Sequence, residues 1–223
     1  MIDALVFDAY GTLFDVQSVS AQCDSLWPGQ GAAVSRIWRS KQLEYSWLRT
    51  LMKRYVDFET LTGDALRWTC ESLGVSCATR DVEQLLAAYR NLAVFPDVAT
   101  AFRNLGNRKR MILSNGSPAM LKAVVHNTGL EDLFDVVVSV DVLGVYKPDP
   151  KVYQLAVDTL HIEASHIGFV SANSWDICGA QSFGLHTYWV NRSRVPGERL
   201  AVEPDHVLTA LTELVRAIDG TCP

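Results

Sequence analysis

An apolar run at residues 5–7 ends abruptly in Asp8, and this junction constrains the fold more than any other stretch of the chain. A short continuous apolar run is typical of a strand that is buried in a parallel sheet. Ligands of open α/β sheets bind beyond the carboxyl ends of such strands. Asp8 is therefore a candidate nucleophile or metal ligand, although an aspartate at this place could also cap the following turn.

The part of the chain after residue 93 alternates between helical and strand-like segments. Repeated β-α units of this kind predict a doubly wound parallel sheet, which is a Rossmann-like α/β fold. We find no internal repeat and no low-complexity tract. The expected strands cover residues 110–113, 136–140, 167–170 and 187–190, and the expected helices cover 98–105, 121–128, 150–160, 180–183 and 207–218.

Residues 16–92 show little strand-like alternation, and their apolar side chains recur at helical spacing. Four or five helices inserted directly after the first strand would form a cap over its carboxyl end. We therefore expect a core domain of residues 1–15 and 93–223 and a helical cap domain of residues 16–92. The residues that set the pattern are Val34, Ile37, Trp38, Tyr45, Leu48 and Leu51, with further helices expected over 61–74 and 81–92.

The net charge of −5 argues against nucleic acid or an acidic membrane as the main partner. No apolar run reaches the roughly 18 residues of a membrane span, and the N-terminal residues do not resemble a secretion signal. The histidines are dispersed, so we expect no zinc site. We also expect no other metal and no cofactor, which the family resemblance described below implies. Scattered cysteines without a C-x-x-C pair fit unpaired thiols in a reducing cytoplasm. The cysteines are Cys23, Cys70, Cys77, Cys178 and Cys222.

Two further apolar runs end in polar clusters, at residues 114–115 and at residues 171–176. The carboxyl ends of parallel strands lie on one edge of a sheet, so these clusters should converge on Asp8. Lys147 lies in a loop with two prolines that would stiffen it and begin a helix. Turn capping is the alternative for the serine and asparagine at 114–115, and an exposed surface lysine is the alternative for Lys147.

Four ordered motifs resemble the haloacid dehalogenase superfamily over essentially the whole chain. They are the strand that ends in Asp8, Ser114, Lys147 and residues 171–176. Most members of that superfamily are magnesium-dependent phosphatases, whose first motif carries a second aspartate and whose fourth motif carries two acids. Here Tyr10 replaces the second aspartate, and Ser171 and Ala172 stand where the first acid of the fourth motif would fall. The sequence is therefore similar to the L-2-haloacid dehalogenase branch in particular. The strings that resemble that branch are FDAYGTLFD, WRSKQLEYSWLR, LSNGSP, YKPDPKVY and SANSWD.

These replacements share one chemical meaning. A phosphate dianion repels an attacking carboxylate, so its hydrolysis needs a divalent cation. An alkoxide leaves poorly without a general acid. A neutral carbon that carries a halogen needs neither aid, because halide is a good leaving group.

The resemblance implies that Asp8 displaces halide from the Cα of a short (S)-2-haloalkanoic acid with inversion. Water then hydrolyses the aspartyl ester and releases an (R)-2-hydroxy acid. Lys147 would keep Asp8 ionised, and Thr12 would orient it. Arg39 would hold the halide with help from Asn115; the WRSKQ match selects Arg39, which otherwise resembles the solvated arginines of the same helix.

The resemblance also assigns the fourth motif to the hydrolytic half of the reaction. Ser171, Asn173 and Asp176 would position Lys147 and the attacking water, with Asp176 as the better proton acceptor. Such an acceptor is needed because the proton of water must leave as the new C–O bond forms. Tyr153 belongs to the same set by resemblance, but it fits a core aromatic residue equally well.

The substrate carboxylate needs uncharged hydrogen-bond donors. Ser114 and the backbone N–H groups near Tyr10 and Gly11 suit this role, because turns and helix starts attract anions. The walls around the alkyl chain are expected from Leu43, Phe58 and Trp175, each of which could instead be ordinary packing.

Three other functions stay open on the sequence alone. They are a magnesium-dependent phosphatase, a non-catalytic binding protein of the same fold, and a hydrolase of another activated C–X bond. Tyr10 argues against the first, and the presence of Asp8, Arg39, Lys147 and Asp176 argues against the second. The preferred halogen, fluoride included, and the chain length stay undetermined.

The resemblance implies a homodimer whose other partners are a small 2-haloacid, halide ion and water. Apolar residues of the cap helices would suit a dimer interface, and packing within the cap explains them equally. These residues are Trp38, Trp47, Leu48 and Leu51.

Overall fold

A computed structural model describes residues 1–220 of this chain, and Cys222 lies outside the described residues. Their centre is a six-stranded parallel sheet with the strand order β5-β4-β1-β6-β7-β8. This arrangement confirms the predicted doubly wound α/β class. The strands are β1 (Ala4–Phe7), β4 (Lys109–Ser114), β5 (Val136–Ser139), β6 (Ile167–Ser171), β7 (His186–Val190) and β8 (His206–Leu208).

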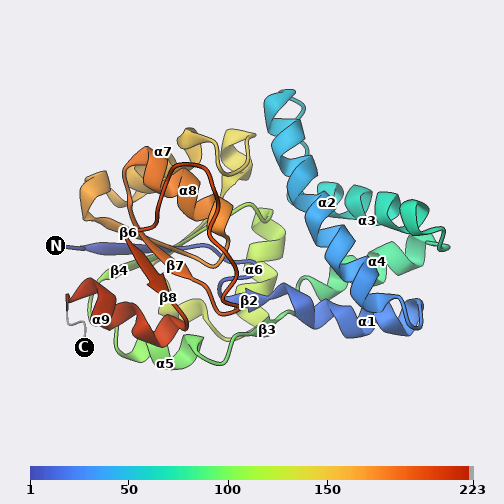
Figure 1. The fold of residues 1–223 in the computed structure, drawn as a ribbon, viewed down its shortest axis with the longest axis horizontal. Helices are drawn as coiled ribbons and strands as arrows, with labels where there is room; N and C mark the ends of the chain where they lie inside the picture. The colour runs from blue at the N-terminus through green and yellow to red at the C-terminus, as the bar shows by residue number, and fades with distance from the viewer. Residues whose placement is uncertain (221–223) are drawn as a thin grey trace.

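Helices cover both faces of the sheet. Figure 1 shows α7 and α8 on one face and α5 and α9 on the other. The central strands β1 and β6 are buried along their whole length, which explains their continuous apolar sequences. The helices are α5 (Val98–Arg103), α6 (Pro118–Asn127), α7 (Pro150–Leu160), α8 (Ser174–Phe183) and α9 (Leu214–Ile218).

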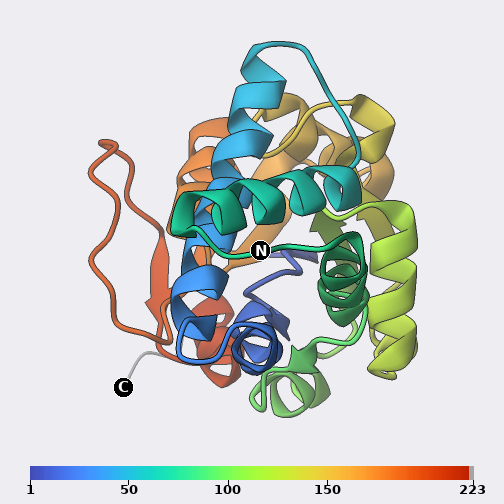
Figure 2. The ribbon, with the colours of Figure 1, turned by 90° about the vertical axis from the view of Figure 1, so that its right-hand side faces the viewer.

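The residues between β1 and α5 form a separate group of helices beside the carboxyl end of the sheet (Figure 1). Two short strands, β2 (Phe14–Asp15) and β3 (Ala93–Val94), pair antiparallel where the chain leaves the sheet and returns to it. Figure 2 shows the helices from the outside, with the sheet behind them. They are α1 (Ser20–Leu26), α2 (Gly31–Leu51), α3 (Phe58–Leu73) and α4 (Thr79–Ala88).

Short polar and proline signals set several helix ends. Asp57 caps α3 by accepting from the N–H groups of Glu59 and Thr60, and Gly74 ends that helix with φ of 66°. Proline follows the N-cap residue of both α6 and α7, where its missing N–H costs nothing. Five single-turn 3₁₀ helices complete the described structure: η1 (Val16–Val19), η2 (Glu131–Leu133), η3 (Val140–Leu143), η4 (Ala164–His166) and η5 (Leu211–Glu213).

The expected helix over 207–218 is wrong in its first half. Val207 lies in the edge strand β8 and is exposed, and helix α9 begins only at Leu214. A short apolar run does not distinguish strand from helix, and the pairing of β8 with β7 decides the outcome. The strand predicted over 136–140 is also less buried than expected, because β5 lies at the other edge of the sheet.

Four cysteines of the described chain, Cys23, Cys70, Cys77 and Cys178, are free thiols. Among residues 1–220, no helix combines the length and the apolar character needed to cross a membrane.

Candidate active site

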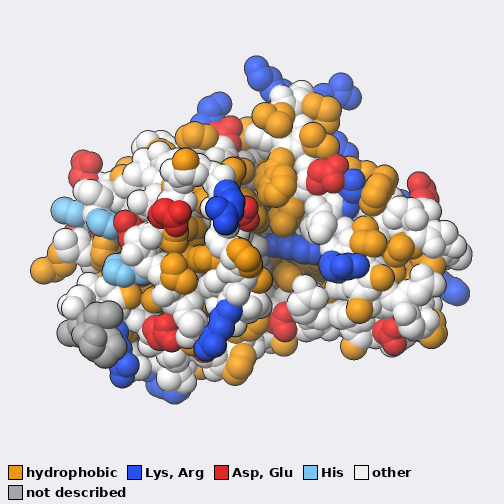
Figure 3. All heavy atoms as spheres, viewed as in Figure 1, with side chains coloured by type: hydrophobic (Ala, Val, Ile, Leu, Met, Phe, Trp, Pro, Cys, Tyr) orange, Lys and Arg blue, Asp and Glu red, His pale blue; other side chains and the backbone are white. Residues whose placement is uncertain are grey.

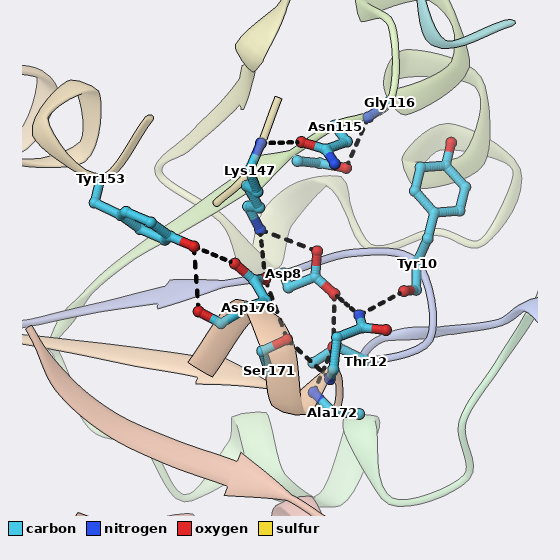
Figure 4. A network of polar contacts seen from close by, with 12 residues as sticks. Asp8, Tyr10, Thr12, Asn115, Gly116, Lys147, Tyr153, Ser171, Ala172 and Asp176 are labelled. Carbon is cyan, nitrogen blue, oxygen red and sulfur yellow. Dashed lines mark hydrogen bonds and ion pairs between the residues drawn. The ribbon is translucent and has the colours of Figure 1, made fainter. Parts of the chain in front are cut away.

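Asp8 lies directly after β1, at the carboxyl edge of the sheet, and is only 6% exposed. Its two carboxylate oxygens accept three hydrogen bonds from side chains (Figure 4). Thr12 Oγ1 and Asn173 Nδ2 each donate to Asp8 Oδ2 over 2.8 Å, and Lys147 Nζ lies 3.0 Å from Oδ1. These donors hold the carboxylate in one orientation.

Lys147 is fully buried and joins two carboxylates. Its Nζ lies 2.9 Å from Asp176 Oδ2 as well as 3.0 Å from Asp8 Oδ1. The ammonium also lies 4.9 Å from the centre of the Phe169 ring. Burial lowers the pKa of Lys147, but the two carboxylates outweigh burial and raise that pKa, so the side chain is a cation.

Asp176 lies in the first turn of α8 and is completely buried. Tyr153 donates to its Oδ1 over 2.8 Å, and Ser171 donates to its Oδ2 over 3.2 Å beside the Lys147 ammonium. Burial raises the pKa of Asp176 to about 6, and the nearby Asp8 carboxylate acts in the same direction, while Lys147 opposes both. Tyr153 is thus a buried aromatic residue that also contacts the polar cluster.

Thr12 and Asn173 tie the loop after β1 to the loop after β6. The Thr12 hydroxyl donates to Asp8 and accepts from the N–H of Ala172 over 2.8 Å. Asn173 Nδ2 donates to Asp8 and, over 3.2 Å, to the carbonyl of Tyr10. Asn173 therefore contacts the carboxylate of Asp8 rather than Lys147, which differs from the sequence expectation.

The residues after β4 are also at this edge of the sheet. Asn115 Oδ1 accepts from the backbone N–H of Lys147 over 3.0 Å, which leaves its Nδ2 to donate elsewhere. Ser114 Oγ accepts from the N–H of Gly116 over 3.1 Å and keeps its own O–H as a donor. Both side chains are buried.

The backbone of Gly11 does not fit the role expected for it. Its N–H donates to the carbonyl of Phe14 over 2.8 Å, so it is engaged within the turn and is not free for a substrate carboxylate. The sharp return of this turn, with Gly11 at φ of 92°, creates that bond.

Arg39 reaches the site from helix α2. Its Nη2 lies 3.4 Å from the carbonyl of Tyr10, and its Nη1 donates to Gln42 Oε1 over 2.6 Å. Gln42 was not among the site residues predicted from the sequence, although it lies three residues after Arg39 and therefore on the same face of the helix. Gln42 is the last residue of the WRSKQ string, so its position relative to Arg39 could have been read from the sequence.

Three residues were expected around the alkyl chain: Leu43, Phe58 and Trp175. Within residues 1–220, none of their side chains forms a hydrogen bond or ion pair with the polar cluster around Asp8. Phe58 is buried, with its ring centre 6.1 Å from that of Tyr10. Trp175 of α8 packs edge-on against Trp47 of α2 at 5.5 Å, which joins the helical insertion to the sheet domain. Leu43 lies half-buried on α2.

The arrangement combines a buried carboxylate, a buried ammonium and several neutral donors. Figure 3 shows Lys and Arg side chains in the groove between the sheet body and helices α1–α4, where they create positive potential. Residues 1–220 contain no cluster of three or more His, Cys, Asp or Glu side chains suited to hold a metal ion. Chemically, the site can present an ionised nucleophile to an anionic substrate that carries a leaving group.

Comparison with known proteins places the chain in a family. A family model described as haloacid dehalogenase-like hydrolase matches residues 2–184. The chain is 48% identical over 220 residues to an (S)-2-haloacid dehalogenase from Pseudomonas sp. (strain YL), which covers 98% of this chain and 95% of that protein.

Solved structures of similar fold also carry the name of a 2-haloacid dehalogenase. L-2-haloacid dehalogenase from Xanthobacter autotrophicus superposes with a TM-score of 0.94 at 41% identity, over 100% of both chains. The structure of the same enzyme with chloropropionic acid covalently bound superposes with a TM-score of 0.93 at 41% identity, again over 100% of both chains.

The chain therefore belongs to the haloacid dehalogenase-like hydrolases. Within them, it belongs to the L-2-haloacid dehalogenase branch.

Proposed function

We propose that this protein hydrolyses short (S)-2-haloalkanoic acids to (R)-2-hydroxy acids through an ester formed on Asp8. The observation that carries the proposal is the buried Asp8 carboxylate at the end of β1, which three side-chain donors hold in place. The names of the relatives and the covalently bound chloropropionic acid in one of them support the same reaction.

In the first step, an oxygen of Asp8 attacks the Cα of the substrate from the side opposite the halogen. A new C–O bond forms as the carbon–halogen bond breaks, and the halogen leaves with its electron pair. Arg39 and the free Nδ2 of Asn115 stabilise the departing halide. The substrate carboxylate takes the hydroxyl of Ser114 and the backbone N–H of Tyr10 as donors, with Gly11 no longer among them.

In the second step, water attacks the Cγ carbonyl of the Asp8 ester. One proton of the water passes to Asp176. The bond between Cγ and the substrate oxygen then breaks, and Asp176 returns that proton to the departing alkoxide, which forms the hydroxy acid. The remaining proton of the attacking water is lost to solvent, which regenerates the Asp8 carboxylate. Thr12, Asn173 and Lys147 stabilise the negative charge that develops on the oxygens at Cγ. Ser171 and Tyr153 keep Asp176 in place.

We infer a division into a core of residues 1–15 and 93–223 and a cap of residues 16–92. The paired strands β2 and β3 at the two connections support these limits. Leu43 and Phe58 of the cap and Trp175 of the core would then enclose the alkyl chain from two sides. The contact between Trp47 and Trp175 closes this boundary.

We propose that the reaction needs no metal. Tyr10 and Ser171 occupy the places where phosphatases of the superfamily carry acids, and the two carboxylates of the site are paired with Lys147. A magnesium-dependent phosphatase is the main competing function, and a hydrolase of another C–X bond is the second.

The test is release of halide from (S)- and (R)-2-chloropropionate in the presence of EDTA. We expect release from the S isomer alone, lost by on the order of 10³-fold or more in Asp8→Asn and kept in Asp158→Asn, which alters an exposed aspartate. In a single turnover in H₂¹⁸O, the label should enter Asp8 and not the product. Absence of halide release together with magnesium-dependent cleavage of a phosphate ester would favour the phosphatase.

We further propose a homodimer in a reducing, cytoplasmic setting. Trp38 is fully buried within the helices, so it does not serve an interface, whereas Leu48 and Leu51 on α2 are exposed. Light scattering should give twice the mass of one chain, and Leu51→Glu should shift it toward the monomer. An unchanged mass in that variant would exclude this face.

A further inference from the structure

We propose that Gln42 and Thr62 form a neutral relay that positions Arg39 and leaves its positive charge uncompensated for the departing halide. This inference rests on the halide-binding role proposed for Arg39. It assigns to Gln42 and Thr62 a positioning role, since neither touches the reacting atoms.

The relay is a continuous chain of hydrogen bonds between helices α2 and α3. Arg39 Nη1 donates to Gln42 Oε1 over 2.6 Å. Gln42 Nε2 donates to Thr62 Oγ1 over 2.7 Å, and that hydroxyl donates to the carbonyl of Phe58 over 2.5 Å. The Thr62 hydroxyl gives its hydrogen to the Phe58 carbonyl and therefore accepts from Gln42 Nε2, so the amide of Gln42 presents its oxygen, not its nitrogen, to Arg39.

Burial makes this orientation rigid. Gln42 and Thr62 are both completely inaccessible to solvent, and the indole N–H of Trp38 donates to the carbonyl of Thr62 over 2.8 Å. A buried amide that lost Thr62 or Arg39 would keep an unsatisfied polar group, which is costly. The guanidinium is therefore held from a fixed point on the cap.

The partners of Arg39 are neutral oxygens. They are Gln42 Oε1 and, at 3.4 Å, the carbonyl of Tyr10, and no ion pair of Arg39 with a carboxylate is found in residues 1–220. A carboxylate at position 42 would make an equally good hydrogen bond, but its charge would cancel much of the attraction between Arg39 and an anion. Glutamine at this position orients the arginine without neutralising it.

Gln42→Glu tests charge, and Gln42→Met tests orientation, since methionine matches the length of glutamine without its polar atoms. Chloride binding is measured by ³⁵Cl NMR line broadening, separately from turnover, and kcat and KM are measured with (S)-2-chloro- and (S)-2-bromopropionate. Gln84→Glu is the matched control, because Gln84 is exposed on α4. Circular dichroism and thermal unfolding establish that each variant is folded.

We expect Gln42→Glu to weaken chloride binding by at least 10-fold and to lower kcat for the chloro substrate on the order of 10²-fold. The bromo substrate should lose less, because bromide needs less stabilisation as it leaves. Thr62→Val keeps the shape of the side chain and both Arg39 and Gln42, so it should fold and weaken chloride binding by a smaller factor, about 3- to 10-fold. Gln84→Glu should bind chloride as the wild type does.

The relay would be overturned if folded Gln42→Glu or Thr62→Val bound chloride as the wild type does and lost kcat equally with the chloro and bromo substrates. The proposed dehalogenation would not be affected by that result. The reverse outcome is also distinct. If the wild type bound chloride through Arg39 and Gln42 but released no halide from any 2-haloacid, the relay would stand and the proposed reaction would fall.

Discussion

Lys147 Nζ lies 3.0 Å from Asp8 Oδ1, and the two residues are 1% and 6% exposed. The same ammonium lies 2.9 Å from Asp176 Oδ2, so one cation serves two buried carboxylates that come from opposite parts of the chain. Without Lys147, each carboxylate would lack its charged partner in a site with little water. Stability and chemistry therefore depend on the same atom.

Replacing Lys147 by methionine should unfold the protein more easily as well as inactivate it. Removing one partner of a buried ion pair leaves an uncompensated charge and costs about 3–5 kcal/mol. Urea denaturation at pH 7 measures the loss. Lys151→Met, at an exposed position on α7, should stay within about 0.5 kcal/mol of the wild type; equal stability of both variants would contradict the expectation.

The rate should depend on the ionisation of Asp176. Burial raises the pKa of this carboxyl to about 6, and only its ionised form can accept a proton from water. We expect kcat to rise with pH through about 6 and to level off above it, in a range where circular dichroism shows the fold intact. A rate that is constant from pH 4.5 to 7.5 would exclude Asp176 as the proton acceptor.

The same group should give an opposite trend in stability. Its pKa in the folded protein, about 6, is higher than the ordinary 3.8, so the folded state binds the proton more tightly than the unfolded state. Its contribution to the free energy of unfolding is full below the ordinary value and is lost as the pH rises through about 6. The free energy of unfolding in urea of the wild type minus that of Asp176→Asn should therefore fall from pH 4 to 6.5. A rise of this quantity over the same range would mean that the pKa of Asp176 is lowered, not raised, by folding.

Replacement of two helical glycines by alanine should change the stability of the protein in opposite directions. A Cβ at Gly179 of α8 would lie 2.6 Å from Pro148 Cβ and would also meet the hydroxyl of Tyr153, so Gly179→Ala should cost about 1–3 kcal/mol and displace Tyr153 from Asp176. Gly63 of α3 has room, with Val82 Cγ1 at 3.5 Å, so Gly63→Ala should stabilise by up to about 1 kcal/mol. Thermal unfolding and kcat of both variants check this, and similar behaviour of the pair would contradict it.

Arg192 should support the catalytic loop from a distance. Its guanidinium makes two bonds of 2.9 Å to Asp97 and one of 3.1 Å to the carbonyl of Thr12. Arg192→Met should cost on the order of 2 kcal/mol and lower kcat several-fold, because Thr12 orients Asp8. Arg199→Met, at an exposed position, serves as the control in urea unfolding and kinetics. Loss of stability at full activity would show that Thr12 keeps its place without Arg192.

The alternation of apolar runs and helices predicted the α/β class, because buried parallel strands need continuous apolar sequence and their carboxyl ends share one edge. Asp8, residues 114–115 and residues 171–176 were found in this way, since each follows such a run directly. Edges of the sheet were harder to predict. Val207 and Val137 are as apolar as the valines of the core. Each is exposed because its strand, β8 or β5, pairs with only one neighbouring strand and lies at an edge of the sheet.

Sequence by itself therefore determined which side chains stand at the strand ends and which chemistry they permit. Only the tertiary structure decided how they are partnered. The side chain of Asn173 contacts Asp8 rather than Lys147, the N–H of Gly11 donates to the carbonyl of Phe14, and Arg39 donates to Gln42, whose amide donates in turn to Thr62. Hydrogen bonds of this kind depend on distance and direction in space between residues as many as 165 positions apart, and local sequence carries no record of them.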